Sequence, residues 1–184
     1  MESIKIMMEE HQYILRMLKV VRKVCMKILN HEEVDYKDFY KVIDFVRNYA
    51  DKHHHSKEEE LLFKELKINL NEENRLGPVT GMLVEHDQGR LYMQNLEAAV
   101  KEVEDGNEEA KLDVIANSIS YTHLLYRHID KEDNLIYPLG EKQLSTEILD
   151  RIEKESKKIE MTATDNKVQE KYIAILEELE NKVG

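Results

Sequence analysis

The chain has 184 residues, a length that suits one domain and is short for two. The chain is 41% hydrophobic and 35% charged, and it has only six glycines and two prolines. These are too few turn-forming residues for an all-β protein, so the composition indicates long helices. The formal net charge of −11 argues against nucleic acid and anionic membranes as partners, because no basic face offsets the repulsion of phosphate.

Four long segments carry apolar residues at the three- and four-residue spacing of a helix with one buried face. They span residues 2–30, about 35–66, 78–104 and about 108–137. The breaks between them read NHEEVD at 30–35, KINLNEENRLGP at 67–78 and DGNE at 105–108, and we expect Pro138 and Gly140 to end the fourth helix.

Short connections make neighbouring helices antiparallel, so the pattern predicts an all-α, up-down-up-down four-helix bundle over residues 1–140. Residues 141–184 predict two further helices, broken near MTATDN at 161–166. We expect this C-terminal helical extension to pack on the bundle or to mediate a homodimer.

The cysteine content and the N-terminus bear on location. Cys25 is the only cysteine, so no disulfide can form within the chain. The first residues lack the basic and apolar regions of a secretory signal, and no apolar run approaches the roughly 20 residues that span a bilayer. We expect a cytoplasmic protein without a membrane span.

One histidine on the apolar face of each helix falls at the same depth of the bundle. His11 and His54 each lie 19 residues from the break at 30–35, about 28 Å at the helical rise of about 1.5 Å per residue. His86 and His128 lie 19 and 20 residues from the DGNE break. The four helices are therefore expected to deliver four imidazoles to one level.

Two carboxylates join these histidines. Glu58 and Glu132 each follow a histidine by four residues, a spacing that turns a helix by only about 40°. A single inward histidine is usually a hydrogen-bonded core residue, and a His-x-x-x-Glu pair is commonly a surface ion pair. Six such groups at one depth would be costly to bury without a cation, so the pattern predicts a metal site of His11, His54, Glu58, His86, His128 and Glu132.

The other histidines are expected to lie outside this site. His53 and His55 point about 100° to either side of His54 on an α-helix, and His123 points about 140° away from His128. His31 falls in a break. We expect all four to lie at the surface or to support the ligands from outside.

The donor set bears on the metal. Imidazole and carboxylate without thiolate suit iron, with manganese or zinc fitting less well. Two six-coordinate ions need about twelve ligand positions, of which four imidazoles, two bridging carboxylates and one bridging oxide or hydroxide fill about ten. The room left suits a small diatomic or peroxidic ligand, and Gly89 offers either a gap for its entry or merely a tolerated helical glycine. No glutamate stands three residues before a histidine, which disfavours a ferritin-like site.

The motifs together resemble the hemerythrin-like, or HHE cation-binding, domain family over residues 5 to about 140. The matching stretches are EEHQYIL around His11, DKHHHSKEEELLF around His54 and Glu58, MLVEHDQGR around His86, and HIDKEDNLIYP around His128 and Glu132. The resemblance implies a four-helix bundle with two iron ions joined by an oxo or hydroxo bridge. Members bind dioxygen, sense oxygen or iron, or take part in the repair of iron-sulfur clusters.

The chain departs from the oxygen-carrying members. Those have a second histidine four residues from the first on helix three, where this chain has Met82 and Arg90. Their last ligand is an aspartate five residues after the final histidine; Asp133 stands there, but helix phase favours Glu132. The His-x-x-x-Glu pairs on helices two and four are closer to the iron-sulfur repair branch.

The leading functional hypothesis is a cytoplasmic non-haem di-iron protein that binds or reacts with dioxygen, nitric oxide or peroxide, in cluster repair or stress response. One alternative is an oxygen- or iron-sensing or storage module without catalysis. Another is a zinc-bound or metal-free helical interaction protein. No nucleophile or acid-base pair accompanies the ligands, so the sequence leaves enzymatic activity open.

Overall fold

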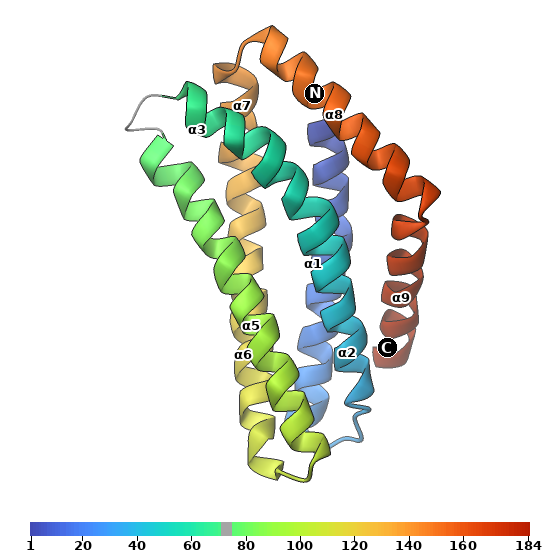
Figure 1. The fold of residues 1–184 in the computed structure, drawn as a ribbon. Coiled ribbons are helices and arrows are strands. Elements are labelled where there is room, and N and C mark those ends of the chain that lie inside the picture. The colour runs from blue at the N-terminus through green and yellow to red at the C-terminus, as the bar shows by residue number, and fades with distance from the viewer. Residues whose placement is uncertain (71–74) are drawn as a thin grey trace.

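The computed structural model describes residues 1–70 and 75–184, and these form helices joined by short connections. No strand occurs among these residues, which confirms the expected all-α class. Four rods alternate in direction, and two further helices follow them (Figure 1). None of the described helices is long and apolar enough to cross a membrane.

The rods are built from consecutive helical segments. The first is α1 (Glu2–Leu29). The second joins α2 (Lys37–Phe45), η1 (Val46–His55), η2 (Glu58–Phe63) and α3 (Lys64–Asn69). The third joins η3 (Arg75–Val79) and α5 (Thr80–Glu104), and the fourth joins η4 (Glu108–Ala110), α6 (Lys111–Lys131), η5 (Glu132–Ile136) and α7 (Tyr137–Gln143).

Several segments of the rods are π-helical, namely η1, η2, η3 and η5. A π-helix closes its hydrogen bonds from residue i to i+5, so each residue advances by less than the roughly 100° of an α-helix. His54 and His55 lie in η1, Glu58 begins η2 and Glu132 begins η5. Three of these four segments, η1, η2 and η5, therefore occur where the sequence predicts the site.

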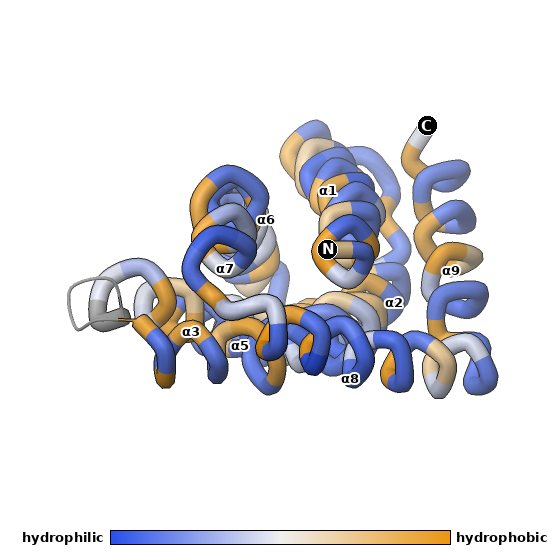
Figure 2. The backbone as a smooth tube through the Cα atoms, turned by 90° about the horizontal axis from the view of Figure 1, so that it is seen from above, coloured by the Kyte–Doolittle hydropathy of each residue, from blue (hydrophilic) through white to orange (hydrophobic). Residues whose placement is uncertain are grey.

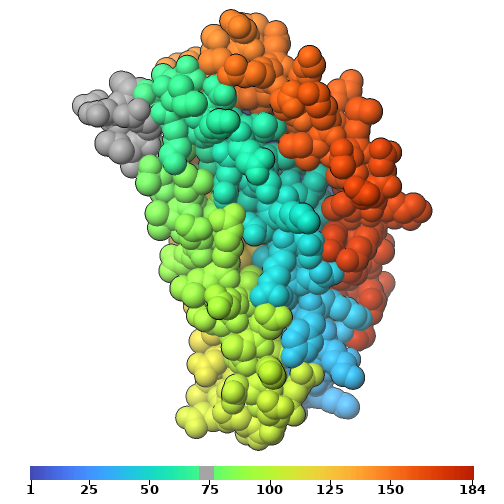
Figure 3. All heavy atoms as spheres, viewed as in Figure 1, coloured from blue at the N-terminus to red at the C-terminus, as the bar shows by residue number. Residues whose placement is uncertain are grey.

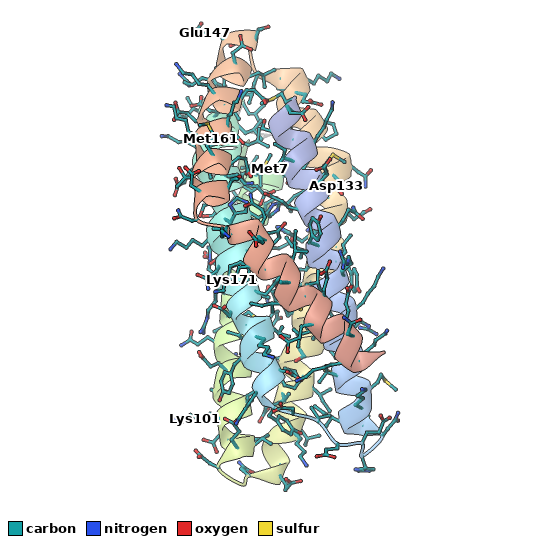
Figure 4. The ribbon with its side chains drawn as sticks, turned by 90° about the vertical axis from the view of Figure 1, so that its right-hand side faces the viewer. Met7, Lys101, Asp133, Glu147, Met161 and Lys171 are labelled. Carbon is teal, nitrogen blue, oxygen red and sulfur yellow. The ribbon has the colours of Figure 1, made fainter. Side chains whose placement is uncertain are left out.

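The core consists of two clusters of buried apolar side chains, stacked along the bundle. On α1, Met7 belongs to one cluster, Ile14 belongs to the other, and His11 lies between them. The labelled Met7 and Asp133 lie in the upper half of the molecule, nearer to α7 and α8 (Figure 4). The polar level is thus closed above and below by apolar packing.

Two sequence expectations about breaks are wrong. Pro138 and Gly140 do not end the fourth helix, which continues to Gln143. Pro138 lies in the first turn of α7, directly after the π-helical η5, where a missing backbone N–H leaves few hydrogen bonds unmade. The stretch 67–78 is also helical at 67–69 and 75–78, while residues 71–74 lie outside the described residues.

The C-terminal helices pack on the bundle of the same chain. Helix α8 (Thr146–Asp165) contacts α1 and η2, and α9 (Val168–Val183) contacts α1 and α2. From above, α9 lies on the α1 and α2 side, away from α5 and α6 (Figure 2). The orange and red extension lies directly against the second rod (Figure 3). The two helices are separated at Lys167, which has a φ of 54° and directly follows the MTATDN segment where the sequence predicts a break. A homodimer through these helices stays a prediction.

Close packing at Gly140 gives a test of how the fourth rod meets the second. A Cβ at Gly140 would lie 2.8 Å from Cδ1 of buried Leu62, whereas one at Gly81 would meet nothing within 4 Å. We expect Gly140→Val to destabilise the protein by about 1–3 kcal/mol through overpacking. Gly81→Ala, the matched control, should be neutral or stabilising by up to about 1 kcal/mol. Urea unfolding followed by circular dichroism measures both, and equal midpoints would contradict this packing.

Candidate metal centre

The structure brings all six predicted site residues together at the polar level. Two overlapping groups have their ligand atoms within 4.8 Å of one another. The first consists of His11, His54, Glu58 and Glu132, and the second consists of His55, Glu58, His86 and His128. Glu58 belongs to both groups. Glu132 also reaches both, because its two oxygens lie 3.3 Å from His11 Nε2 and 3.0 Å from His128 Nε2.

His55 is the member that the sequence analysis missed. It was expected at the surface or outside the site, but its ring is 6% exposed and stacks on His86 with 3.9 Å between centroids. The expectation assumed about 100° per residue, whereas His55 lies in a π-helical segment with a smaller angle per residue and belongs to the second group. His53 is buried too, but it faces Glu10 at 2.8 Å. His123 is exposed, as expected.

Four of the five imidazoles are oriented by a carboxylate from another rod. The Nδ1 atoms of His11, His54, His86 and His128 lie 2.7, 2.7, 2.7 and 2.9 Å from oxygens of Asp133, Glu10, Glu59 and Glu85 respectively. A carboxylate at Nδ1 accepts a hydrogen bond from the ring N–H there and leaves the lone pair on Nε2. The Nε2 atoms thus become electron donors directed at the centre.

These carboxylates form a closed circuit around the bundle. Each of them stands next to a predicted site residue in the sequence, as in the pairs at 10–11, 58–59, 85–86 and 132–133. Each then contacts the histidine of the following rod, and the fourth rod's Asp133 returns to His11 on the first. Asp133, the alternative ligand, therefore lies outside both groups, while Glu132 lies inside.

The inward Nε2 atoms are held close together in pairs. His11 and His54 approach to 2.9 Å between their Nε2 atoms, and so do His86 and His128. Two imidazole lone pairs at this distance repel each other unless a proton or a metal ion lies between them. The geometry therefore requires a proton or a metal ion between the two nitrogens of each pair.

The two inner carboxylates also lack the partners that burial demands. Tyr137 donates a hydrogen bond of 2.5 Å to Glu58 Oε1, but Glu58 Oε2 and both oxygens of Glu132 accept none from the described residues. Both glutamates are fully buried. Buried carboxylate oxygens without hydrogen bonds are strongly unfavourable, and a coordinated cation removes that penalty. The residues present thus fit a pair of metal ions.

Outside the circuit, cations neutralise the orienting carboxylates. Lys57 donates to Glu10, and Lys131 donates to Glu85. Arg90 donates to Glu59 at 2.7 Å. At His54, His86 and His128, an imidazole, a carboxylate and a cation therefore follow one another outward from the centre.

The electrostatics indicate where protons reside when metal is removed. Burial alone would lower the pKa of His11, but Asp133 and Glu132 outweigh it and raise that pKa to about 9. Burial likewise opposes protonation of His128, yet Glu132 and Glu85 raise its pKa to about 10. Burial and the charge of Glu132 raise the pKa of Glu58 to about 8. Protons thus take the place of metal charge in the metal-free protein.

His54 behaves differently. Burial and the nearby charge of His11 lower its pKa to about 4, despite the hydrogen bond to Glu10. Burial and the charge of His86 also lower the pKa of His55. Both imidazoles are therefore neutral at physiological pH, and their lone pairs are available to a cation without loss of a proton.

The family model for the hemerythrin HHE cation-binding domain matches residues 2–140. The chain belongs to this family. The match contains every residue of both groups and of the carboxylate circuit, and it ends before α8. Membership and the buried groups together assign a metal-binding function to the chain. The metal that this family binds is typically iron. No curated protein and no solved structure matched the chain significantly.

The protonated histidines predict how stability depends on pH. His11 and His128 keep their protons up to about pH 9 and about pH 10 in the folded chain, against 6.5 for an unperturbed histidine. Their contribution is complete below pH 6.5 and is lost as the pH rises through the folded pKa values. Metal-free protein should therefore show a melting temperature that falls from about pH 6.5 to 9.

Metal should reverse this trend, because bound ions replace the protons and their affinity rises as protons become scarcer. Melting curves of chelator-treated and metal-loaded protein at matched pH values measure both effects. A metal-free melting temperature that rises over this pH range would show that His11 and His128 are not the dominant titrating groups.

Proposed function

We propose that the protein is a non-haem di-iron protein that binds or reacts with a small ligand such as dioxygen, nitric oxide or peroxide. His11 and His54 would hold one ion, and His55, His86 and His128 would hold the other. Glu58 and Glu132 would bridge them. The observation that carries the proposal is the pair of buried groups that share Glu58 and contain three carboxylate oxygens without hydrogen bonds.

The spacing of the nitrogens favours six-coordinate ions. Two nitrogen ligands about 2.1 Å from one ion lie about 3.0 Å apart at a right angle and about 3.4 Å apart at a tetrahedral angle. The paired Nε2 atoms are 2.9 Å apart. Together with the absence of thiolate from both groups, this supports iron over tetrahedral zinc, with manganese as the closest competitor.

The fifth imidazole changes the ligand count. Two six-coordinate ions have about twelve ligand positions. About eleven of them are filled by five imidazoles, two bridging carboxylates and one bridging oxide or hydroxide. His55 on the second rod thus makes up for the histidine that helix three lacks. About one position stays open, which suits a single small ligand and makes reversible oxygen binding a candidate activity.

A cavity of about 130 Å³ adjoins the second group and supports the binding of a small ligand there. Its wall includes His55, His86 and His128, and Gly89 contributes a side without a side chain. Tyr121 also lines it, and this buried hydroxyl has no hydrogen-bond partner among the described residues. The space suits a diatomic or peroxidic molecule and offers it a hydrogen-bond donor.

The physiological role is the finer part of the proposal. Two His-x-x-x-Glu pairs resemble the iron-sulfur repair branch, namely His54 with Glu58 and His128 with Glu132. All four residues belong to the two groups. We therefore favour cluster repair or stress response over oxygen or iron sensing and over storage. Each of these roles uses the same centre.

Metal loading tests the proposal directly. Protein expressed with iron and purified without oxygen should contain about two irons per chain and, after exposure to oxygen, show near-ultraviolet absorption of an oxo-bridged centre. His128→Ala should lower the iron content to about one or less, whereas the exposed His123→Ala should keep it at about two. Uptake of zinc alone would favour the helical interaction protein instead. So would a melting temperature that changes neither with chelators nor in His54→Ala.

Filling the cavity separates ligand access from metal binding. A Cβ at Gly89 would stand 3.5 Å from the Tyr121 ring, an ordinary contact, so a larger side chain must occupy the cavity itself. We expect Gly89→Leu to keep two irons while weakening nitric oxide binding by about tenfold or more, equivalent to at least about 1.4 kcal/mol. Optical titration with nitric oxide measures this, with Gly81→Ala as the control. Unchanged binding in Gly89→Leu would exclude this cavity as the ligand site.

A further inference from the structure

A buried lysine connects the C-terminal extension to the metal centre. Lys57 lies three residues after His54, and its side chain is 1% exposed. Its ammonium group donates to one oxygen of Glu10 on α1 and to one oxygen of Glu160 on α8. It also lies 3.4 Å from His53 Nε2. Because water does not solvate this charge, the two carboxylates fix its position.

Glu10 continues the connection inward. Its Oε1 accepts a hydrogen bond from Lys57, while its Oε2 lies 2.7 Å from His54 Nδ1 and accepts a hydrogen bond from the ring N–H. One carboxylate therefore contacts both the buried ammonium and a histidine of the first group. The position and charge of Lys57 act on His54 through this single side chain.

Glu160 is the outer end of the connection, and it belongs to the extension rather than to the family domain, which the match ends at residue 140. Gln169 of α9 donates a hydrogen bond of 2.9 Å to the second oxygen of Glu160. Both helices of the extension therefore hold this carboxylate. By contrast, Arg90 and Lys131, which neutralise the carboxylates of His86 and His128, lie within residues 2–140.

We propose that Glu160 is a positioning residue for the metal ligand His54, acting through Lys57 and Glu10. The seating of the extension on the bundle and the binding of metal at His54 are then energetically coupled. The metal part of this inference rests on the proposed function, whereas the side-chain connection stands on contacts in the protein alone.

The direction of the coupling follows from the charges. Lys57 shares its positive charge between Glu10 and Glu160, which leaves Glu10 a strong acceptor for His54 Nδ1–H. Without the Glu160 charge, Glu10 is the one carboxylate left among these contacts of Lys57, and the undivided positive charge weakens Glu10 as an acceptor. His54 then becomes a poorer electron donor and is less firmly oriented, so metal affinity falls. By reciprocity, bound metal must stabilise the seating of α8.

The test compares Glu160→Gln with Glu155→Gln, a control on the same helix whose carboxylate pairs with the exposed Lys158. Ferrous iron affinity, measured without oxygen by competition with a chelator, should fall by about tenfold or more in Glu160→Gln and stay unchanged in the control. Glu160→Asp, which keeps the charge, should recover most of the loss. A Glu160→Gln affinity equal to that of the wild type overturns the proposal.

Hydrogen exchange provides a second readout that a general loss of stability would not reproduce. Iron should slow amide exchange in α8 of the wild type and of Glu155→Gln, and should have little effect there in Glu160→Gln. Protection of α8 that is the same with and without iron in the wild type also contradicts the coupling.

The metal-free protein separates failure of this inference from failure of the proposed function. If the wild type binds no iron, the proposed function fails, but the connection is still measurable. Melting temperatures of Lys57→Met, Glu160→Gln and the double variant should then be non-additive, because the two side chains share one ion pair. Additive shifts would overturn the connection itself.

Discussion

The burial of two carboxylates and five imidazoles in one layer of the bundle is the constraint on which the rest of the structure depends. Apolar clusters close this layer on both sides, so solvent cannot screen its charges. Such a layer is tolerable only if every donor and acceptor is directed toward a partner. The carboxylates at Nδ1 satisfy the outer side of four rings, and the inner side is left to cations.

The circuit of carboxylates makes the packing of the rods and the geometry of the site the same set of interactions. Each rod contributes an acid that holds the histidine of the next rod, and Asp133 closes the circuit on His11. Moving one rod therefore turns an imidazole on its neighbour. Lys131 and Arg90 extend this dependence to the surface of the bundle, and the buried Lys57 extends it to α8.

Much of this arrangement could be predicted from the sequence, because regular helices convert residue counts into depth. That conversion brought His11, His54, His86 and His128 to one level, and it gave the class and the direction of the rods. It failed at His55, where a π-helical turn changes the angle per residue. It also missed Glu10, Glu59 and Glu85, because an acid beside an inward residue is normally on a solvated face, and only the packing reveals that it meets the next rod. Pro138 misled in the same way, since its effect depends on the π-helical turn before it.

The two groups are not equivalent, and the difference assigns them separate tasks. Around His11 and His54, the ring of Tyr137, the buried Lys57 and helix α8 close the site. Around His55, His86 and His128, a cavity leaves space beside the imidazoles. Under the proposed function, the open group would exchange a ligand, and the closed group would hold its ion beside the extension. Because Glu58 belongs to both groups and Glu132 reaches both, a change in charge at one group would act on the other.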